Sequence, residues 1–313
     1  MIAASPLAVL EQALDWLELG ESVALVTLVG IEGSASRSLG TQMAVTSTGR
    51  SIGSFSGGCI ETAIVAEAQK MLEAGFGRTV RFGLGSPYID VRLPCGGGID
   101  LLFTPRPSPA VLREAIGRLQ ARQSSRLFVS AKEVGWSIPG FALDLFPPLR
   151  IVALGQGEDL AAFVRLAASF GAEIEAHSPQ ADLVEELHRQ GHAARPLSHL
   201  NGLQELTGDP WTAFVFLFHD RDWEDALLPH ALCQPALFFG AIGSQKTHAA
   251  RIQRLRSAGC SEAALAKLSG HIGLIPATRD PATLAVSILA ELADRYAQAC
   301  AAEPAVTRMA IAG

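Results

Sequence analysis

The chain has 313 residues, of which 49% are hydrophobic and 18% are charged, and its formal net charge is −6. This length suggests two domains, and the apolar fraction is enough for a buried core in each. A negative balance without a basic run argues against nucleic acid or an anionic membrane surface as a partner. No apolar stretch reaches the roughly 18 residues that span a bilayer, and we find no export signal, so we expect a cytoplasmic protein.

The five cysteines do not have the spacing of a disulfide framework or of a common zinc site. Their number is odd and no pair is spaced as CxxC, so neither kind of site is expected. We expect Cys233, Cys260 and Cys300 to be buried small hydrophobic residues. Cys59 and Cys95 each adjoin glycines and are treated separately below.

The first third of the chain is typical of a small α+β domain. Leucines at helical spacing between Leu7 and Leu17 predict an amphipathic helix that ends at Gly20. A second helix is predicted over Ile60–Ala74. Apolar and alternating runs predict strands at Ser22–Ile31, Thr41–Ser47, Ser51–Phe55, Thr79–Phe82, Tyr88–Leu93 and Ile99–Phe103. We therefore assign residues 1–104 to an N-terminal domain.

A proline-rich break at residues 104–109 separates this domain from the rest of the chain. Residues 105–149 are expected to be a linker region with a helix, Pro109–Gln123, and a short strand, Arg126–Ser130. From Arg150 onward, strands and helices alternate, which predicts parallel βαβ units and a doubly wound sheet. Its strands are predicted at Arg150–Leu154, Glu173–His177, Ala213–Phe218 and Ala236–Phe239. Residues 150–313 are thus a Rossmann-like domain, which includes a long helix from Asp280 to about Ala301.

Three glycine-containing loops of the first domain are candidates for ligand binding. The loop at residues 33–40 contains Gly33, Ser34 and Arg37. Small residues let backbone N–H groups crowd around an anion, and an arginine can bind a phosphate through two hydrogen bonds. The alternative is a flexible connection that carries a surface arginine.

The second loop has a cysteine at the start of a predicted helix. Ser56, Gly57 and Gly58 precede Cys59, and Glu61 follows it. The helix N-terminus directs N–H groups at a bound ligand and favours the thiolate of Cys59. A thiolate is a soft donor for a metal and can also carry sulfur. The alternatives are a buried thiol, and a glutamate that only stabilises the helix.

The third loop places Cys95 before Gly96, Gly97 and Gly98. Consecutive glycines indicate that the backbone approaches a ligand closely, and the alternative is a hairpin with a buried thiol. Two cysteine–glycine loops in one domain make a two-cysteine site possible, with Cys59 and Cys95 contacting a metal or a sulfur ligand.

The second domain begins with an incomplete dinucleotide fingerprint. Gly155 and Gly157 follow the first strand, but Leu160 replaces the third glycine, and Glu158 and Asp159 would face a pyrophosphate. The second strand ends in His177 instead of an acidic residue. These departures make NAD(P) binding doubtful, although they leave the architecture unchanged.

Two further junctions lie where parallel strands end, which is where such sheets bind ligands. His219 and Asp220 follow one strand, and Asp220 can orient the imidazole of His219. Gly243 and Ser244 follow the next strand and precede a helix, which Ser244 can cap. The alternative for His219 and Asp220 is a polar cap of the strand.

Taken together, these motifs resemble those of the xanthine dehydrogenase accessory factor (XdhC/CoxI) family over nearly the whole chain. The matching positions in the first domain are Gly33, Ser34, Arg37, Gly40, Met43, Ser56–Cys59, Glu61 and Cys95–Gly97. Those in the second domain are Gly155–Gly157, His219–Asp220, Gly240–Ser244, Ile272–Leu274 and Ala285–Glu291. The family often has proline at the position of Ser36 and commonly arginine at that of Gln245.

The resemblance implies an accessory protein that binds molybdenum cofactor of the molybdopterin type, carries it without using it, and protects its terminal sulfur ligand. It also implies delivery to a molybdenum hydroxylase such as xanthine dehydrogenase, with a cysteine desulfurase as a further candidate partner, and a homodimer. No acid–base pair or nucleophile triad is evident, which favours binding over turnover. Two rival functions are an NAD(P)-dependent oxidoreductase and a thiol-based sulfurtransferase that uses Cys59.

Overall fold

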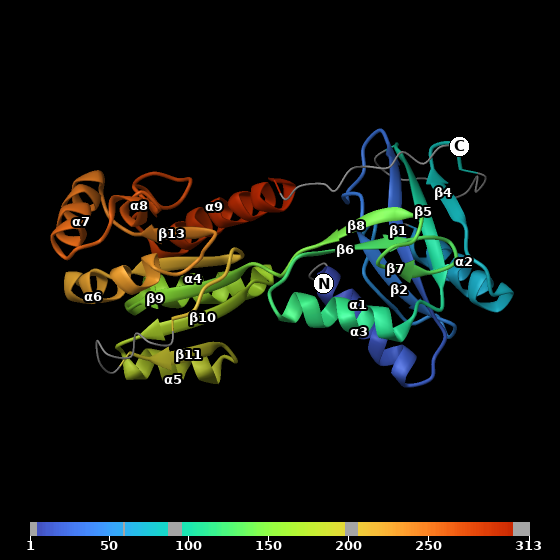
Figure 1. The fold of residues 1–313 in the computed structure, drawn as a ribbon, viewed down its shortest axis with the longest axis horizontal. Helices are drawn as coiled ribbons and strands as arrows, with labels where there is room; N and C mark the ends of the chain where they lie inside the picture. Colours follow the sequence, from blue (N-terminus) through green and yellow to red (C-terminus); the bar gives the residue numbers. More distant parts are fainter. Residues whose placement is uncertain (1–4, 59, 87–95, 198–205, 303–313) are drawn as a thin grey trace. The chain divides into compact units, whose positions relative to one another are not determined.

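A computed structural model describes residues 5–58, 60–86, 96–197 and 206–302. The chain divides into two compact units, one that ends at Pro147 and one that begins at Pro148 (Figure 1). No helix among the described residues combines the length and the hydropathy needed to cross a membrane.

The first unit is built on a five-stranded antiparallel sheet with the strand order β3-β2-β1-β5-β4. The strands are β1 (Val23–Glu32), β2 (Gln42–Thr46), β3 (Ser51–Ile52), β4 (Thr79–Gly83) and β5 (Gly98–Pro105). Helix α2 (Glu61–Ala74) covers one face, and α1 (Pro6–Glu18) and α3 (Pro109–Gln120) cover the other. Successive residues of β1 point to opposite faces, so Val23 and Leu25 pack with α1 and α3, whereas Ala24 and Val26 pack with α2.

The segment expected to be a linker region contributes to the core of the first unit. It contains α3 and a three-stranded antiparallel sheet of β6 (Ser125–Val129), β7 (Val134–Gly135) and β8 (Phe141–Leu145). Leu112, Leu127 and Leu143 from this segment are buried in one cluster with residues of α1 and β1. The segment therefore forms part of the sandwich around the central sheet.

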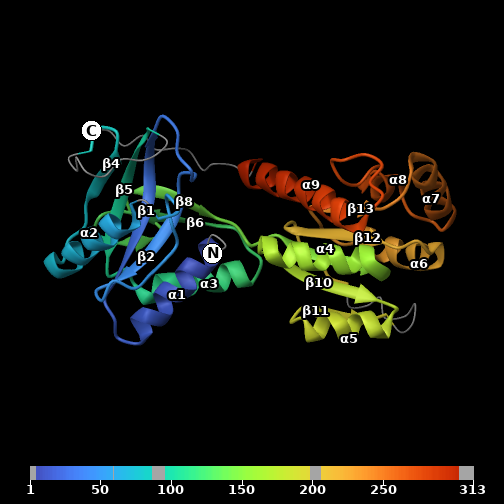
Figure 2. The same cartoon turned by 180° about the vertical axis from the view of Figure 1, so that it is seen from behind.

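The second unit contains a six-stranded parallel sheet with the order β11-β10-β9-β12-β13-β14, which is the doubly wound Rossmann order. Its strands are β9 (Arg150–Gly155), β10 (Glu173–Ser178), β11 (Ala193–Pro196), β12 (Thr212–Leu217), β13 (Phe238–Ala241) and β14 (Leu268–Ser269). The predicted α/β fold class is confirmed. Figure 2 shows the same unit from behind.

Helices cover both faces of the parallel sheet. One face carries α4 (Gly157–Phe170), α5 (Ala181–Arg189) and α9 (Pro281–Ala302). The other carries α6 (Arg221–Leu232), α7 (Gln245–Ser257) and α8 (Glu262–Leu265). Ile288 and Leu292 of α9 are fully buried against the sheet, and Leu284 packs beside them. The apolar stripe of α9 is thus used within its own unit.

Most elements predicted from periodicity are confirmed, with small shifts at their ends. The short strands β7, β8, β11 and β14 were not predicted. The strand predicted at Tyr88–Leu93 lies outside the described residues.

Candidate functional site

The three glycine loops predicted as candidate sites come together at one end of the sheet in the first unit. Glu32 at the end of β1 pairs with Gly98 at the start of β5. The loop after β1 and the segment before β5 therefore lie side by side. A Cβ atom on Gly33 would lie 3.5 Å from the Cα atom of Gly97, so the first and third loops are in contact.

Gly97 is required by this contact. A Cβ atom at this position would overlap the carbonyl oxygen of Ser34 and would lie 2.8 Å from that of Glu32. Its neighbours Gly33 and Gly96 adopt positive φ angles of 74° and 69°, which L-residues other than glycine rarely adopt. The glycines predicted to allow close approach of a ligand thus first allow close approach of two protein loops.

The loop after β1 also holds the loop before α2. The Ser36 hydroxyl donates a hydrogen bond to the carbonyl oxygen of Phe55 at 2.7 Å. Arg37 donates from Nε to the carbonyl of Ser54 and from Nη1 to the carbonyl of Ser36, both at 3.1 Å. These contacts leave Nη2 of Arg37 with no hydrogen bond to any described residue, so a positioned cationic donor remains available at the site.

Glu61, in the first turn of α2, organises the loop that precedes it. Each of its carboxylate oxygens accepts three hydrogen bonds. The donors, at 2.6–3.2 Å, are the hydroxyls of Ser54 and Ser56 and the backbone N–H groups of Phe55, Ser56, Gly58 and Ile60. Burial alone would raise the pKa of Glu61, but these hydrogen bonds outweigh it and lower the pKa to about 2.

This network changes the interpretation of the loop at residues 56–58. Its backbone N–H groups were expected to be free for a ligand, but those of Ser56 and Gly58 bind Glu61, and that of Gly57 binds the Ser54 hydroxyl at 2.9 Å. The sequence suggested that Glu61 either belongs to the cofactor site or only stabilises the helix. The structure shows an internal anion around which the loop folds.

The two cysteines of the candidate site, Cys59 and Cys95, lie outside the described residues. Of the other three, Cys233 is exposed and Cys260 and Cys300 are partly buried, so the prediction that all three are buried is wrong. Cys260 packs at the edge of the core under α6, α7 and α8.

In the second unit, the turn between β9 and α4 is formed by Gly155 and Gly157. A Cβ atom on Gly155 would lie 2.6 Å from the carbonyl oxygen of Leu217 on β12, so this glycine allows the two strands to approach. The N–H of Gly157, which would face a pyrophosphate, donates to the side-chain oxygen of Gln180 at 2.7 Å. Leu160, at the third glycine position, is completely buried in the core.

His219 and Asp220 were expected to interact with each other, but the structure gives each a different partner. The Nε2 atom of His219 lies 3.1 Å from Oδ2 of Asp159 in the first turn of α4. Asp220 caps α6 by accepting a hydrogen bond from the N–H of Asp222 at 3.0 Å. The prediction that Asp220 orients His219 is therefore wrong. The carboxylate beside the imidazole of His219 is that of Asp159.

His177, where a ribose-binding acid would stand, is buried at the end of β10 and pairs with Glu175 at 3.4 Å. The hydrogen bond from His177 is the main cause that lowers the pKa of Glu175 to about 2, against the opposing effect of burial. Arg150 and Arg195 also contact Glu175. The residues at this strand end are thus satisfied by one another.

Gly243 and Ser244 form the junction between β13 and α7. Gly243 has a φ of 141°, and the Ser244 hydroxyl accepts a hydrogen bond from the N–H of Thr247 at 3.2 Å, as the predicted cap requires. Both residues line a pocket together with His219.

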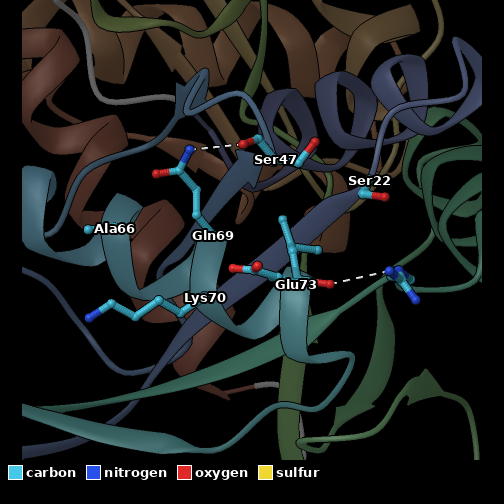
Figure 3. Close-up of a pocket in the computed structure, with 8 residues that line it drawn as sticks. Ser22, Ser47, Ala66, Gln69, Lys70 and Glu73 are labelled. Atoms are coloured by element: carbon cyan, nitrogen blue, oxygen red, sulfur yellow. Dashed lines mark hydrogen bonds between the residues drawn. The ribbon is translucent and has the colours of Figure 1, made fainter.

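A different hollow lies on the first unit, away from the predicted loops. It has a volume of about 610 Å³ and is lined mainly by polar residues of α2, with Ser22, Ser47 and Arg106 (Figure 3). Gln69 donates a hydrogen bond across it to the carbonyl of Ser47 at 2.9 Å. Because Ser22 precedes β1, whereas the glycine loops follow its end, this hollow belongs to the opposite end of the sheet.

Comparison with known proteins gives matches along most of the chain. Residues 16–83 match the model of the XdhC and CoxI family, and residues 151–292 match the model of the XdhC Rossmann domain. The molybdenum cofactor insertion chaperone PaoD of Escherichia coli (strain K12) is 34% identical over 300 residues, which cover 91% of this chain and 87% of the relative.

One solved structure extends the comparison to the fold. It is a protein of Bacillus halodurans described as a xanthine dehydrogenase, with a TM-score of 0.74 and 19% identity. The alignment covers 96% of this chain and 98% of the other. At this identity the match shows a shared fold.

Proposed function

The chain belongs to the XdhC and CoxI family, and on that premise we propose that it is an accessory protein that binds molybdenum cofactor and inserts it into a molybdenum hydroxylase. The observation that carries this proposal is the likeness to a molybdenum cofactor insertion chaperone over 91% of the chain. The three glycine loops support it, because they contain the first-unit motifs that carry the family resemblance and lie together at one end of that unit.

The first unit contributes a cationic donor and the two cysteines to the proposed cofactor contacts. Arg37 is held by two carbonyl groups and keeps one nitrogen for an anionic group. Glu61 holds the N–H groups of Gly58 and Ile60, the residues on either side of Cys59. The N–H groups of Gly58 and Ile60 are therefore held by a protein carboxylate.

We further propose that the thiols of Cys59 and Cys95 contact molybdenum or its terminal sulfur and protect the sulfurated form of the cofactor. A thiolate is the side-chain donor best suited to a soft metal. The other residues proposed to contact the cofactor in the first unit are Gly33, Ser34, Arg37, Ser56, Gly57, Gly58, Glu61, Gly96 and Gly97. Those proposed in the second unit are Gly155, Gly157, His219, Asp220, Gly243 and Ser244. Within this set, Glu61 and Asp220 are positioning residues. Glu61 accepts a hydrogen bond from the N–H of Gly58, and Asp220 accepts one from the N–H of Asp222.

The proposed partners are a hydroxylase of the xanthine dehydrogenase type and a cysteine desulfurase that supplies sulfur. We also propose a homodimer, on the family resemblance alone, since the stripe on α9 is already covered within its unit. Light scattering at micromolar concentration should give a mass near twice 33.0 kDa. A mass near that of a single chain would contradict the dimer.

Transfer of the cofactor tests the function. The protein, purified from a molybdenum-replete host, should contain pterin and molybdenum and should activate a hydroxylase apoenzyme in a purified mixture. Protein without bound pterin that carries a persulfide on Cys59 would instead favour the sulfurtransferase function.

A further inference from the structure

The second unit has a pocket at the edge of the sheet where parallel strands end. It has a volume of about 760 Å³ and is formed by the loops that follow β12 and β13, by the first turns of α7, and by residues 271–280. Doubly wound sheets bind their ligands at this edge. The charges that line the pocket show which kind of ligand it suits.

Every carboxylate that lines this pocket already accepts a hydrogen bond from the protein. Asp159 contacts His219 at 3.1 Å, and Asp280 accepts the N–H of Thr283 at 2.8 Å. Glu224 is fully engaged by Arg251 at 2.8 and 2.9 Å. The acidic groups of the pocket therefore need no cation from a ligand.

The cationic side of the pocket is not satisfied in this way. Arg221 and Arg279 line it, both are exposed, and neither forms a hydrogen bond or ion pair with a described residue. Guanidinium groups bind phosphate oxygens through paired hydrogen bonds. Two such groups beside one pocket favour an anionic ligand.

The N-terminus of α7 provides further donors. The backbone N–H groups of Gly243, Ser244, Gln245 and Lys246 form no hydrogen bond with a described residue, and the first turn of α7 has no acidic side chain. A helix N-terminus with free N–H groups is an anion-binding element when a second feature points to a ligand there.

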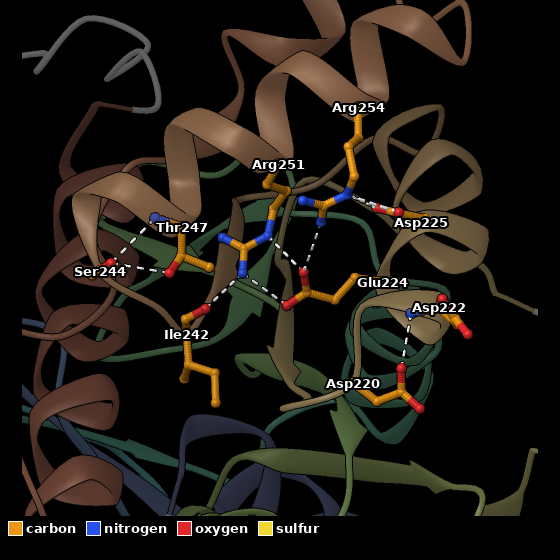
Figure 4. A network of polar contacts seen from close by, with 9 residues as sticks. All are labelled: Asp220, Asp222, Glu224, Asp225, Ile242, Ser244, Thr247, Arg251 and Arg254. Atoms are coloured by element: carbon orange, nitrogen blue, oxygen red, sulfur yellow. Dashed lines mark hydrogen bonds and ion pairs between the residues drawn. The ribbon is translucent and has the colours of Figure 1, made fainter.

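Arg251 provides that second feature. Its side chain is only 1% exposed and lines the pocket. Nε and Nη2 bind Glu224, and Nη2 also binds the carbonyl of Ile242 at 2.6 Å. Nη1 is buried without a hydrogen-bond partner among the described residues, and it points toward Thr247 in the first turn of α7 (Figure 4). A buried guanidinium donor is thus left unsatisfied beside the free N–H groups of the helix.

The glycine turn after β9, where such a fold would ordinarily bind phosphate, has the opposite character. The N–H of Gly157 is bonded to Gln180, and Glu158 follows it in the helix. The hollow beside this turn is lined by Asp182 and Glu186 and also by Arg165 and Arg189, and Arg165 pairs with Glu186 at 3.5 Å. The first turn of α4 thus carries two acidic side chains and a bonded N–H group at Gly157, whereas the first turn of α7 carries no acidic side chain.

We propose that the pocket at α7 binds the phosphate or diphosphate end of the cofactor, with Arg221, Arg279 and the backbone N–H groups of residues 243–245 as its contacts. This inference rests on the proposed function for the identity of the cargo. The anion site itself follows from the charges and donors of the second unit.

Titration calorimetry of the full chain with inorganic pyrophosphate and with inorganic phosphate tests the site. We expect Arg221→Ala and Arg279→Ala each to weaken pyrophosphate binding about tenfold, since each removes a charge-assisted contact. Arg189→Ala is the matched control, because Arg189 is also exposed and unpaired among the described residues but lines the hollow beside the turn after β9. It should leave the affinity unchanged.

The results separate the anion site from the proposed function. Equal weakening by all three substitutions, or no binding of either anion, would overturn the site. If Arg221→Ala and Arg279→Ala weaken pyrophosphate binding and also lower the pterin content of purified protein, both inferences are supported. If pyrophosphate binds as predicted but the wild-type protein takes up no pterin, the anion site stands and the proposed function fails.

Discussion

A single carboxylate holds the loop that carries Cys59. Six hydrogen bonds converge on Glu61, and a carboxylate with this many donors stabilises the fold in its charged form. Substitution to glutamine would place an NH₂ group against three donors and leave them without an acceptor. The loop should loosen although the residue keeps its size.

We expect Glu61→Gln to lower the free energy of unfolding by about 1–3 kcal/mol at pH 7. Because the pKa of Glu61 is lowered from 4.5 to about 2, its stabilisation is complete above pH about 4.5 and is lost as the pH falls toward about 2. Urea unfolding at pH 7 and at pH 3 should therefore show a smaller difference in unfolding free energy between wild type and variant at the lower pH.

Glu73→Gln, on the exposed side of the same helix, should change the free energy of unfolding by less than about 0.5 kcal/mol. Equal effects of the two substitutions would contradict the role of Glu61.

Gly97 allows two loops to approach, and its replacement tests that contact. Gly97→Ala should destabilise the protein by about 1–3 kcal/mol, because the added carbon overlaps backbone oxygens that have little room to move. Gly117→Ala should have the opposite sign and stabilise by up to about 1 kcal/mol, since Gly117 is helical, exposed and without close neighbours. Thermal unfolding of both variants measures this. A neutral Gly97→Ala would show that the loops are not tightly packed.

At the scale of elements, the turn between β9 and α4 has the Rossmann shape, but the N–H of Gly157 that would face a pyrophosphate is not free. We expect no NAD binding tighter than about 1 mM, or roughly −4 kcal/mol. The N–H of Gly157 is already bonded to Gln180, and His219 is joined to Asp159 beside the turn. Calorimetry decides this, and micromolar NAD affinity would favour the oxidoreductase function.

The elements differ in how well the sequence predicted them. Long buried strands such as β9 and β12 stand out as apolar runs between turn residues, so they were found. The two-residue strands β7 and β14 are too short to show any periodicity. β11 pairs only at the sheet edge through a mostly exposed, alanine-containing segment, and composition does not distinguish it from a loop.

At the scale of the molecule, the fold class was predicted because strand and helix periodicities alternate after Arg150. The meeting of the three glycine loops could not be predicted from spacing, because it depends on the antiparallel pairing of β1 with β5. The partner of His219 was also missed, since a hydrogen bond to a residue 60 positions away leaves no trace in local sequence. The donors to Glu61 lie within seven residues of it, but their convergence depends on the path of the loop. The family resemblance indicated which loops belong to the site. The structure shows the backbone contacts and hydrogen bonds that connect them.

The cofactor content of thiol variants tests the account most directly. Wild type, Cys59→Ala, Cys95→Ala and the control Cys233→Ala, whose cysteine is exposed in the second unit, should be purified from one molybdenum-replete host and assayed for pterin and molybdenum. We predict that Cys233→Ala matches wild type, and that Cys59→Ala contains much less cofactor while it unfolds at the same temperature. Full cofactor content in both Cys59→Ala and Cys95→Ala would contradict the proposed thiol site.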